Sequence, residues 1–146
     1  MPSLTEALNN VFVLSSLKDA WEKTQKSNHE WGGWIYYIPL SNSYSIKLKT
    51  DKGNKSIILT RPKDLQDLTK KDYTIISDFH CHPGGEMNAC KPSNEDISGA
   101  KQLTYHRLVF TYDTNLDVHK VKFLMACDPR PTPENFPKNT IMWWIC

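Results

Sequence analysis

The spacing of apolar residues predicts one amphipathic helix at the start of the chain. Between residues 4 and 26, apolar side chains recur every three or four positions, which is the spacing of a single helix face. We expect this face to pack on a sheet. The residues that form it are Leu4, Leu8, Val11, Leu14, Leu17 and Trp21.

Six strands are predicted in the remaining chain. Six segments rich in β-branched and aromatic residues have this character: 29–40, 44–50, 55–60, 73–82, 106–114 and 119–128. Ser93 has the position of an N-cap for a second helix, which runs to about Tyr105. The order of elements predicts an α/β (α+β) protein with a mixed β-sheet flanked by helices.

The C-terminal segment is expected to be an extended tail. Prolines are frequent in residues 128–146, and the segment ends in the apolar run IMWWIC. Such a run would be a liability in water, so we expect it to pack against the body of the protein. The prediction is therefore a single domain over residues 1–146, with a core at about 5–127 and the tail at 128–146.

Composition narrows the class of protein. A chain of 146 residues with 39% hydrophobic and 11% aromatic content is typical of one folded domain. The net charge is only +2 and the lysines are scattered, so nothing favours nucleic acid as a partner. No segment has the ~20 apolar residues of a membrane span. The four cysteines form no CxxC pair and no secretory signal opens the chain, so we expect a cytoplasmic protein with reduced thiols.

Two histidines at the end of segment 73–82 are the first candidate metal ligands. Because side chains alternate along a strand, His80 and His82 point to one face and Cys81 to the other. The loop that follows begins Pro-Gly-Gly, which leaves room for a ligand. Two neutral imidazoles suit zinc, and a catalytic zinc needs a third protein ligand and one open position.

Ser93, Asp96 and Glu30 complete the candidate site. If Ser93 caps its helix, Asp96 lies one turn into that helix and can be the third zinc ligand. The open position would hold water, whose pKa zinc lowers to about 7. Glu30 precedes Trp-Gly-Gly at the start of the first strand and is the candidate general base. Ser93 is a candidate donor to an oxyanion.

Each motif also has a purely structural explanation. A His-x-His pair can be a surface feature of a strand, and a Ser followed three residues later by an acid is a capping box. Their joint occurrence, in order and on the expected elements, favours the metal. Glu86 is a weaker candidate base because no strand orients it. Asp78 is expected to orient a histidine, Cys81 to pack in the core, and Cys90 to be an alternative ligand.

The segments HEWGG, HCHP and PSNED together resemble the JAMM motif, also called MPN+ or JAB. The resemblance implies a zinc metallopeptidase with a cytidine-deaminase-like α/β/α fold, and many members cleave isopeptide bonds to ubiquitin-like proteins. It implies Glu30 as the general acid/base, His80, His82 and Asp96 as zinc ligands, and Ser93 as the oxyanion-stabilising serine. The loop between the second histidine and the serine is longer than usual, as in some bacterial JAB-like domains found in toxin and secretion contexts.

The resulting hypothesis is a Zn2+-dependent hydrolase that cleaves amide bonds in a protein or peptide substrate. A delivered toxin domain with the same chemistry, and a non-catalytic binding scaffold, are the alternatives. A nucleobase deaminase is disfavoured, because those zinc enzymes use His-x-Glu and Pro-Cys-x-x-Cys motifs. The resemblance allows for a cognate partner protein, and we expect neither nucleic acid nor a membrane as a partner.

Overall fold

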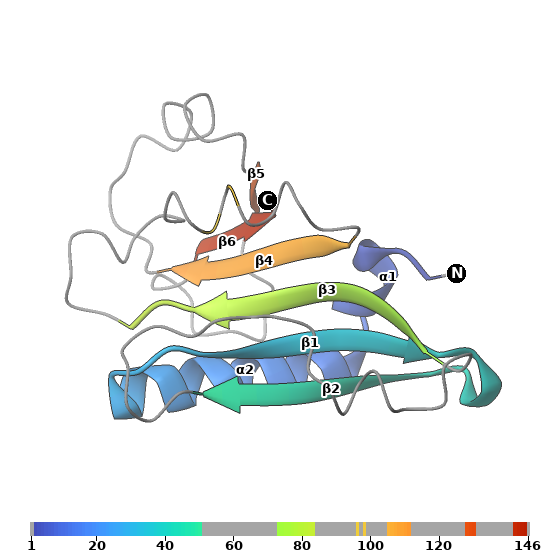
Figure 1. Ribbon diagram of the computed structural model, residues 1–146, viewed down its shortest axis with the longest axis horizontal. Coiled ribbons are helices and arrows are strands. Elements are labelled where there is room, and N and C mark those ends of the chain that lie inside the picture. Colours follow the sequence, from blue (N-terminus) through green and yellow to red (C-terminus); the bar gives the residue numbers. More distant parts are fainter. Residues whose placement is uncertain are drawn as a thin grey trace.

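The computed structural model describes residues 2–50, 73–83, 96, 98, 105–111, 128–130 and 142–145. Within these residues two helices pack on one face of a six-stranded sheet (Figure 1). This confirms the predicted mixed sheet with packed helices. The elements are α1 (Leu4–Leu8), α2 (Val11–Ser27), β1 (Trp31–Ile38), the 3-10 turn η1 (Pro39–Ser41), β2 (Ser43–Thr50), β3 (Thr74–Cys81), β4 (His106–Thr111), β5 (Asp128–Arg130) and β6 (Met142–Ile145).

The helix predicted over residues 4–26 is two helices, because an Asn-Asn pair interrupts it. Asn10 caps α2 by accepting a hydrogen bond from the Val13 backbone N–H at 3.1 Å. Asparagine competes with helical backbone bonds and therefore favours caps. Leu4, Leu17 and Trp21 of the predicted face are buried, but the break changes the orientation of the residues that follow it. Val11, predicted to be buried, is 81% exposed, and Val13 is fully buried instead.

β1 and β2 form a hairpin around η1. Pro39 begins the turn, as expected for a residue that ends a strand, and Asn42 closes it in the left-handed conformation. Gly33 in β1 has a φ of +157°, which side-chain-bearing residues rarely adopt. A Cβ at this position would lie 1.8 Å from the Lys47 carbonyl oxygen. Glycine is therefore required for β2 to pair with β1 here.

β3 lies inside the sheet, whose order is β2-β1-β3-β4-β6-β5. β3 and β4 are parallel, and the other neighbours are antiparallel. β5 and β6 belong to the predicted tail, yet β6 pairs with β4, so the sheet extends past the expected core limit at residue 127. Trp144 of β6 is buried, and its indole N–H donates to Thr111 Oγ1 at 2.8 Å.

Both faces of β3 and β4 are buried, but only one of them carries charged residues. The face toward the helices is apolar, and its cluster includes Val13, Leu17, Ala20, Trp21, Ile35, Phe79, Cys81, Leu108 and Phe110. Strand alternation places polar residues on the opposite face. There Asp78 lies opposite Trp34 of β1 and beside Arg107 of β4 in the pairing register.

Several predicted elements lie outside the described residues. They are the strand at 55–60, most of the strand at 119–128 and most of the helix from Ser93 to about Tyr105. Asp96 and Ser98 are described from that helix, and both are helical. Among the described helices, none combines the length and apolar character needed to cross a bilayer.

Candidate metal centre

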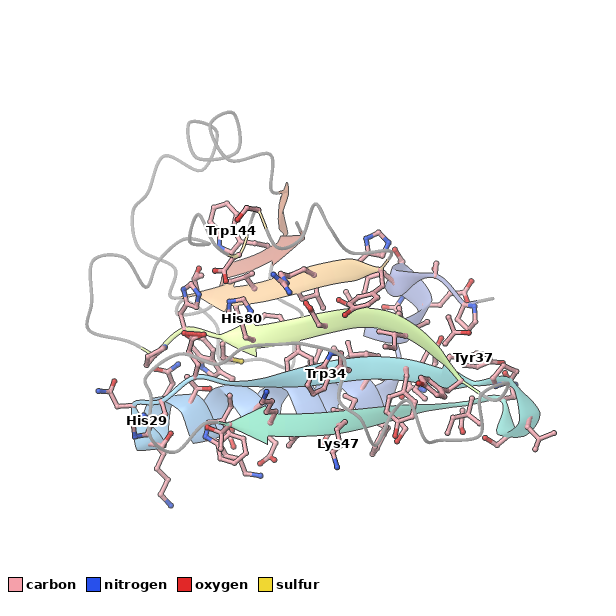
Figure 2. All side chains as sticks on the ribbon, viewed as in Figure 1. His29, Trp34, Tyr37, Lys47, His80 and Trp144 are labelled. Carbon is pink, nitrogen blue, oxygen red and sulfur yellow. The ribbon has the colours of Figure 1, made fainter. Side chains whose placement is uncertain are left out.

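The two histidines converge at the end of β3, as predicted. Their Nε2 atoms lie 3.2 Å apart, and their ring centroids lie 5.1 Å apart. His82 follows the last residue of β3, but its backbone is still held as in a strand. Its N–H donates to the Phe110 carbonyl at 2.9 Å, and its carbonyl accepts from Gln25 Nε2 at 3.1 Å. Figure 2 shows His80 on the face of the sheet opposite α2.

Asp96 reaches both imidazoles, which confirms that the helical residue and the strand end come together. Its Oδ1 lies 2.9 Å from His80 Nε2, and its Oδ2 lies 3.2 Å from His82 Nε2. The exposed fractions of the three side chains are 4% for His80, 9% for His82 and 15% for Asp96. The longer loop between the motifs therefore does not prevent Asp96 from meeting the histidines.

Glu30 is brought to the same place by the pairing of β1 with β3. Gly32 lies opposite His80, and alternation puts Glu30 on the same face as Gly32. One carboxylate oxygen of Glu30 and one nitrogen of each histidine lie within 4.8 Å of one another. These three side chains are close enough to hold a metal ion.

The peptide group between Glu30 and Trp31 is anchored through both its carbonyl and its N–H. Its carbonyl accepts a hydrogen bond from Thr50 Oγ1 at 3.0 Å, which ties it to the end of β2. The N–H of Trp31 donates to Thr24 Oγ1, also at 3.0 Å, which ties it to α2. The start of β1 is therefore held between a strand and a helix.

The donor set fits a cation. Imidazole nitrogen and carboxylate oxygen are ordinary ligands of zinc and of other first-row metals. In addition, the Nδ1 atoms of His80 and His82 are buried and have no hydrogen-bond partner among the residues that the structure describes. Among the described residues, the rings make their polar contacts through Nε2, to each other and to the Asp96 carboxylate. A cation at that point would satisfy all three groups.

The charges of the cluster shift the pKa values of its members. Burial acts to lower the pKa of His80, but the charge and hydrogen bond of Asp96, together with Glu30 and Asp78, raise it above its ordinary value. Burial acts to raise the pKa of Asp96, but His80 and His82 hold it well below its usual range. Without a metal, an ionised Asp96 therefore favours the protonated form of His80.

Asp78 does not orient a histidine, and that prediction is wrong. Both of its oxygens are bonded to the Arg107 guanidinium, from Nε at 2.9 Å and from Nη2 at 2.8 Å. Burial raises the pKa of Asp78 and Arg107 opposes this shift, while Asp78 raises the pKa of Arg107 against the effect of burial. The bidentate geometry is that of an ionised pair.

Arg107 is a residue that the sequence reasoning missed. A third nitrogen, Nη1, donates to the backbone carbonyl of Asp96 at 3.2 Å. The sequence does contain a signal for this pair. The strand segments TIISDFHC and HRLVFT are largely apolar, and each has one residue that is charged at neutral pH, Asp78 in the first and Arg107 in the second. A buried charge needs a partner, so two such segments predict a pair across adjacent strands.

Among the remaining candidates, Cys81 is a core residue. It is fully buried on the helix side, and burial raises the pKa of its thiol well above the ordinary value. It is therefore unsuited to act as a thiolate. Trp34 is 1% exposed and lies on the face that carries His80 (Figure 2). Ser93, Glu86 and Cys90 lie outside the described residues.

Comparisons of this chain with protein-family models, with curated proteins and with solved structures found no match. The resemblance to the JAMM family therefore stays a prediction that depends on the motif residues.

Proposed function

We propose that this protein is a zinc-dependent amide hydrolase of the JAMM type, built on a JAB/MPN fold. The observation that carries the proposal is the convergence of Glu30 with His80, His82 and Asp96 at one end of the sheet. These residues come from three separated parts of the chain. Their order and chemistry are those that the motif implies.

Zinc is the metal we propose for the site. His80, His82 and Asp96 are its protein ligands, which gives a set of two nitrogens and one oxygen with a further position left open. When bound, zinc supplies Lewis acidity, which polarises a substrate carbonyl and acidifies a water molecule.

Glu30 is the general base and acid in this proposal. It lies beside the two histidines on an anchored stretch of backbone, so its carboxylate can accept a proton from the attacking water. The same group then returns the proton to the departing amine. Ser93 would donate a hydrogen bond to the developing oxyanion, an assignment that depends on the family resemblance.

The substrate class is a protein or peptide amide, either a peptide bond or an isopeptide bond to a ubiquitin-like protein. A toxin-type role acting on a host or rival protein would use the same residues on a different target. A non-catalytic scaffold would lack zinc-dependent turnover, so the same experiment separates it. A cognate partner protein and a cytoplasmic location stay predictions.

The test is the Glu30→Gln substitution, measured together with zinc content. We expect the wild-type protein to purify with about one zinc per chain and to cleave a member of a panel of ubiquitin-like fusions and short peptides. Glu30→Gln should keep its zinc and lose about 10²- to 10⁴-fold in turnover. Glu22→Gln makes the same chemical change on the exposed surface of α2 and should leave both quantities unchanged.

Two results would contradict the proposal. A wild-type protein that binds no zinc would remove the metal centre. A fully zinc-loaded Glu30→Gln protein with wild-type turnover would leave the metal in place and show that the mechanism is wrong.

A further inference from the structure

Arg107 and Asp78 form a buried ion pair between the parallel strands β3 and β4. Asp78 is fully buried and Arg107 is 8% exposed. Their two hydrogen bonds, at 2.8 and 2.9 Å, occupy Nε and Nη2 of the guanidinium. Because the guanidinium is planar, this pairing fixes the direction in which the remaining nitrogen points.

That remaining nitrogen bonds to the residue that completes the metal cluster. Arg107 Nη1 donates to the Asp96 carbonyl at 3.2 Å. One rigid group therefore joins β3, β4 and the helical residue whose carboxylate meets the two histidines. It acts on the backbone of Asp96 and leaves the carboxylate oxygens directed toward the imidazoles.

Asp96 needs such a contact more than the histidines do. His80 lies within β3, and both backbone groups of His82 are bonded, so the sheet fixes the two imidazoles. Asp96 lies on a separate helix, and its position relative to the sheet must be set by tertiary contacts. The hydrogen bond from Arg107 is one such contact. It ties the backbone of Asp96 to β4 and, through Asp78, to β3, the strand that carries His80.

We propose that Arg107 is a positioning residue of the metal centre, oriented by Asp78 and acting through the backbone of Asp96. The inference rests on the proposed zinc site and adds to it two residues outside the JAMM motif. Groups that orient metal ligands in this way typically change metal affinity by about 10- to 100-fold when they are removed.

The alternative is that the pair serves only the stability of the sheet. Buried ion pairs can often be replaced by apolar residues of similar volume without loss of stability, whereas removal of one partner alone is strongly destabilising. A double substitution therefore separates the two roles: Asp78→Leu with Arg107→Met removes both charges and also the bond to Asp96.

The experiment measures zinc affinity by competition with a chromophoric chelator and, separately, the melting temperature of the zinc-free protein. We expect the double variant to melt near the wild type and to bind zinc roughly 10- to 100-fold more weakly. The matched control is Thr111→Val, which removes the bond between Thr111 and Trp144 on the same face. It should lower the melting temperature and leave zinc affinity unchanged.

Arg107→Lys provides a second test of the positioning role if the double variant does not fold. Lysine keeps a positive charge beside Asp78 but has no planar fork with which to reach the Asp96 carbonyl as well. We expect its zinc affinity to fall by a similar factor, with the fold retained as judged by circular dichroism. No rescue by lysine is expected, because charge alone does not position Asp96.

The outcomes distinguish this inference from the proposed function. If the wild type binds zinc and the variants of Arg107 bind it equally tightly, the positioning role is wrong and the zinc site stands. If the zinc affinity of the variants falls only in proportion to their loss of stability, the pair is structural. If the wild type binds no zinc, both proposals fail.

Discussion

The two faces of β3 and β4 are equally buried, yet the charged residues lie on only one of them. On the helix side, Phe79 and Leu108 are fully buried in an apolar cluster. On the other side, their sequence neighbours Asp78, His80 and Arg107 are between 0% and 8% exposed. The apolar face is stabilised by removal of its surface from water, whereas the polar face is tolerated only because the charges have partners.

This difference implies that the two faces carry different properties. Changes to the apolar face should act on the free energy of unfolding, and changes to the charged and metal-ligating residues of the opposite face should act on metal affinity and turnover. Neighbouring positions on β3 allow a direct comparison, because they share a backbone and differ in the face to which they point.

The largest expected effect on stability is from Phe79→Ala. It removes a fully buried ring that packs on Phe110 with a centroid distance of 6.2 Å. Large-to-small core changes of this kind cost about 3–5 kcal/mol in the free energy of unfolding. Urea unfolding measures the loss. The folded fraction should still bind zinc at the wild-type stoichiometry, and loss of zinc from folded protein would show that the faces are not separable.

His80→Ala is the matched change on the opposite face. It should abolish the stabilisation that zinc confers, which is about 4 kcal/mol when free zinc is about 1,000-fold above the dissociation constant. Melting curves with zinc and with a chelator give this difference directly. A variant whose melting temperature still rises with zinc, as in the wild type, would place the metal elsewhere.

Thr24→Val tests a polar contact that links the helix side to the site. Its hydroxyl accepts the Trp31 N–H at 3.0 Å, and loss of this part-buried hydrogen bond costs about 1 kcal/mol. We expect turnover to fall, because the backbone beside Glu30 is less constrained, and zinc affinity to stay the same. Thr111→Val loses a comparable buried bond away from Glu30, so its turnover should match the wild type.

The smallest expected effect is a pH dependence of stability. It should have opposite signs for the zinc-free protein and for the stabilisation that zinc adds. In the zinc-free protein His80 has a raised pKa, so its contribution to stability is complete below the ordinary value of 6.5 and is lost as pH rises through the folded-state pKa. Asp96 has a lowered pKa, so its contribution is present above 3.8 and is lost only in strong acid. The zinc-free protein should therefore melt at a lower temperature at pH 8.5 than at pH 6.

The stabilisation that zinc adds should change with pH in the opposite direction. Metal ligands must be deprotonated, so zinc binding competes with the proton on His80 and strengthens as pH rises. Melting curves at the two pH values, with zinc and with a chelator, should diverge toward alkaline pH. Parallel curves would mean that the imidazoles are not the zinc ligands.

Much of the candidate site was predictable because its local parts obey short-range rules. The period of two along a strand placed both histidines on one face and Cys81 on the other. The joint order of the motifs selected Glu30 and Asp96, and the structure brings both to the histidines. The continuous first helix was wrong for an equally local reason, since Asn10 prefers to cap a helix rather than continue one.

The role of Asp78 could not be read from the same rules. The spacing between Asp78 and His80 indicates only that they share a face. Whether the partner of Asp78 is a histidine or an arginine depended on which strands lie on either side of β3. One of these neighbours is β4, which runs parallel to β3 in a register that places Arg107 beside Asp78. Strand order depends on contacts between segments far apart in the chain, which no local period encodes.

The amino-acid sequence by itself therefore determined which donors this protein has and which of them share a strand face, because alternation is a property of each strand alone. Only the tertiary structure decided that β1 pairs with β3 in the register that brings Glu30 to the histidines, and that Arg107 of β4 connects Asp78 of β3 to Asp96. The physical reason is that such contacts are stable only when the whole sheet is assembled, since each buried charge and each anchored carbonyl needs a partner from another segment.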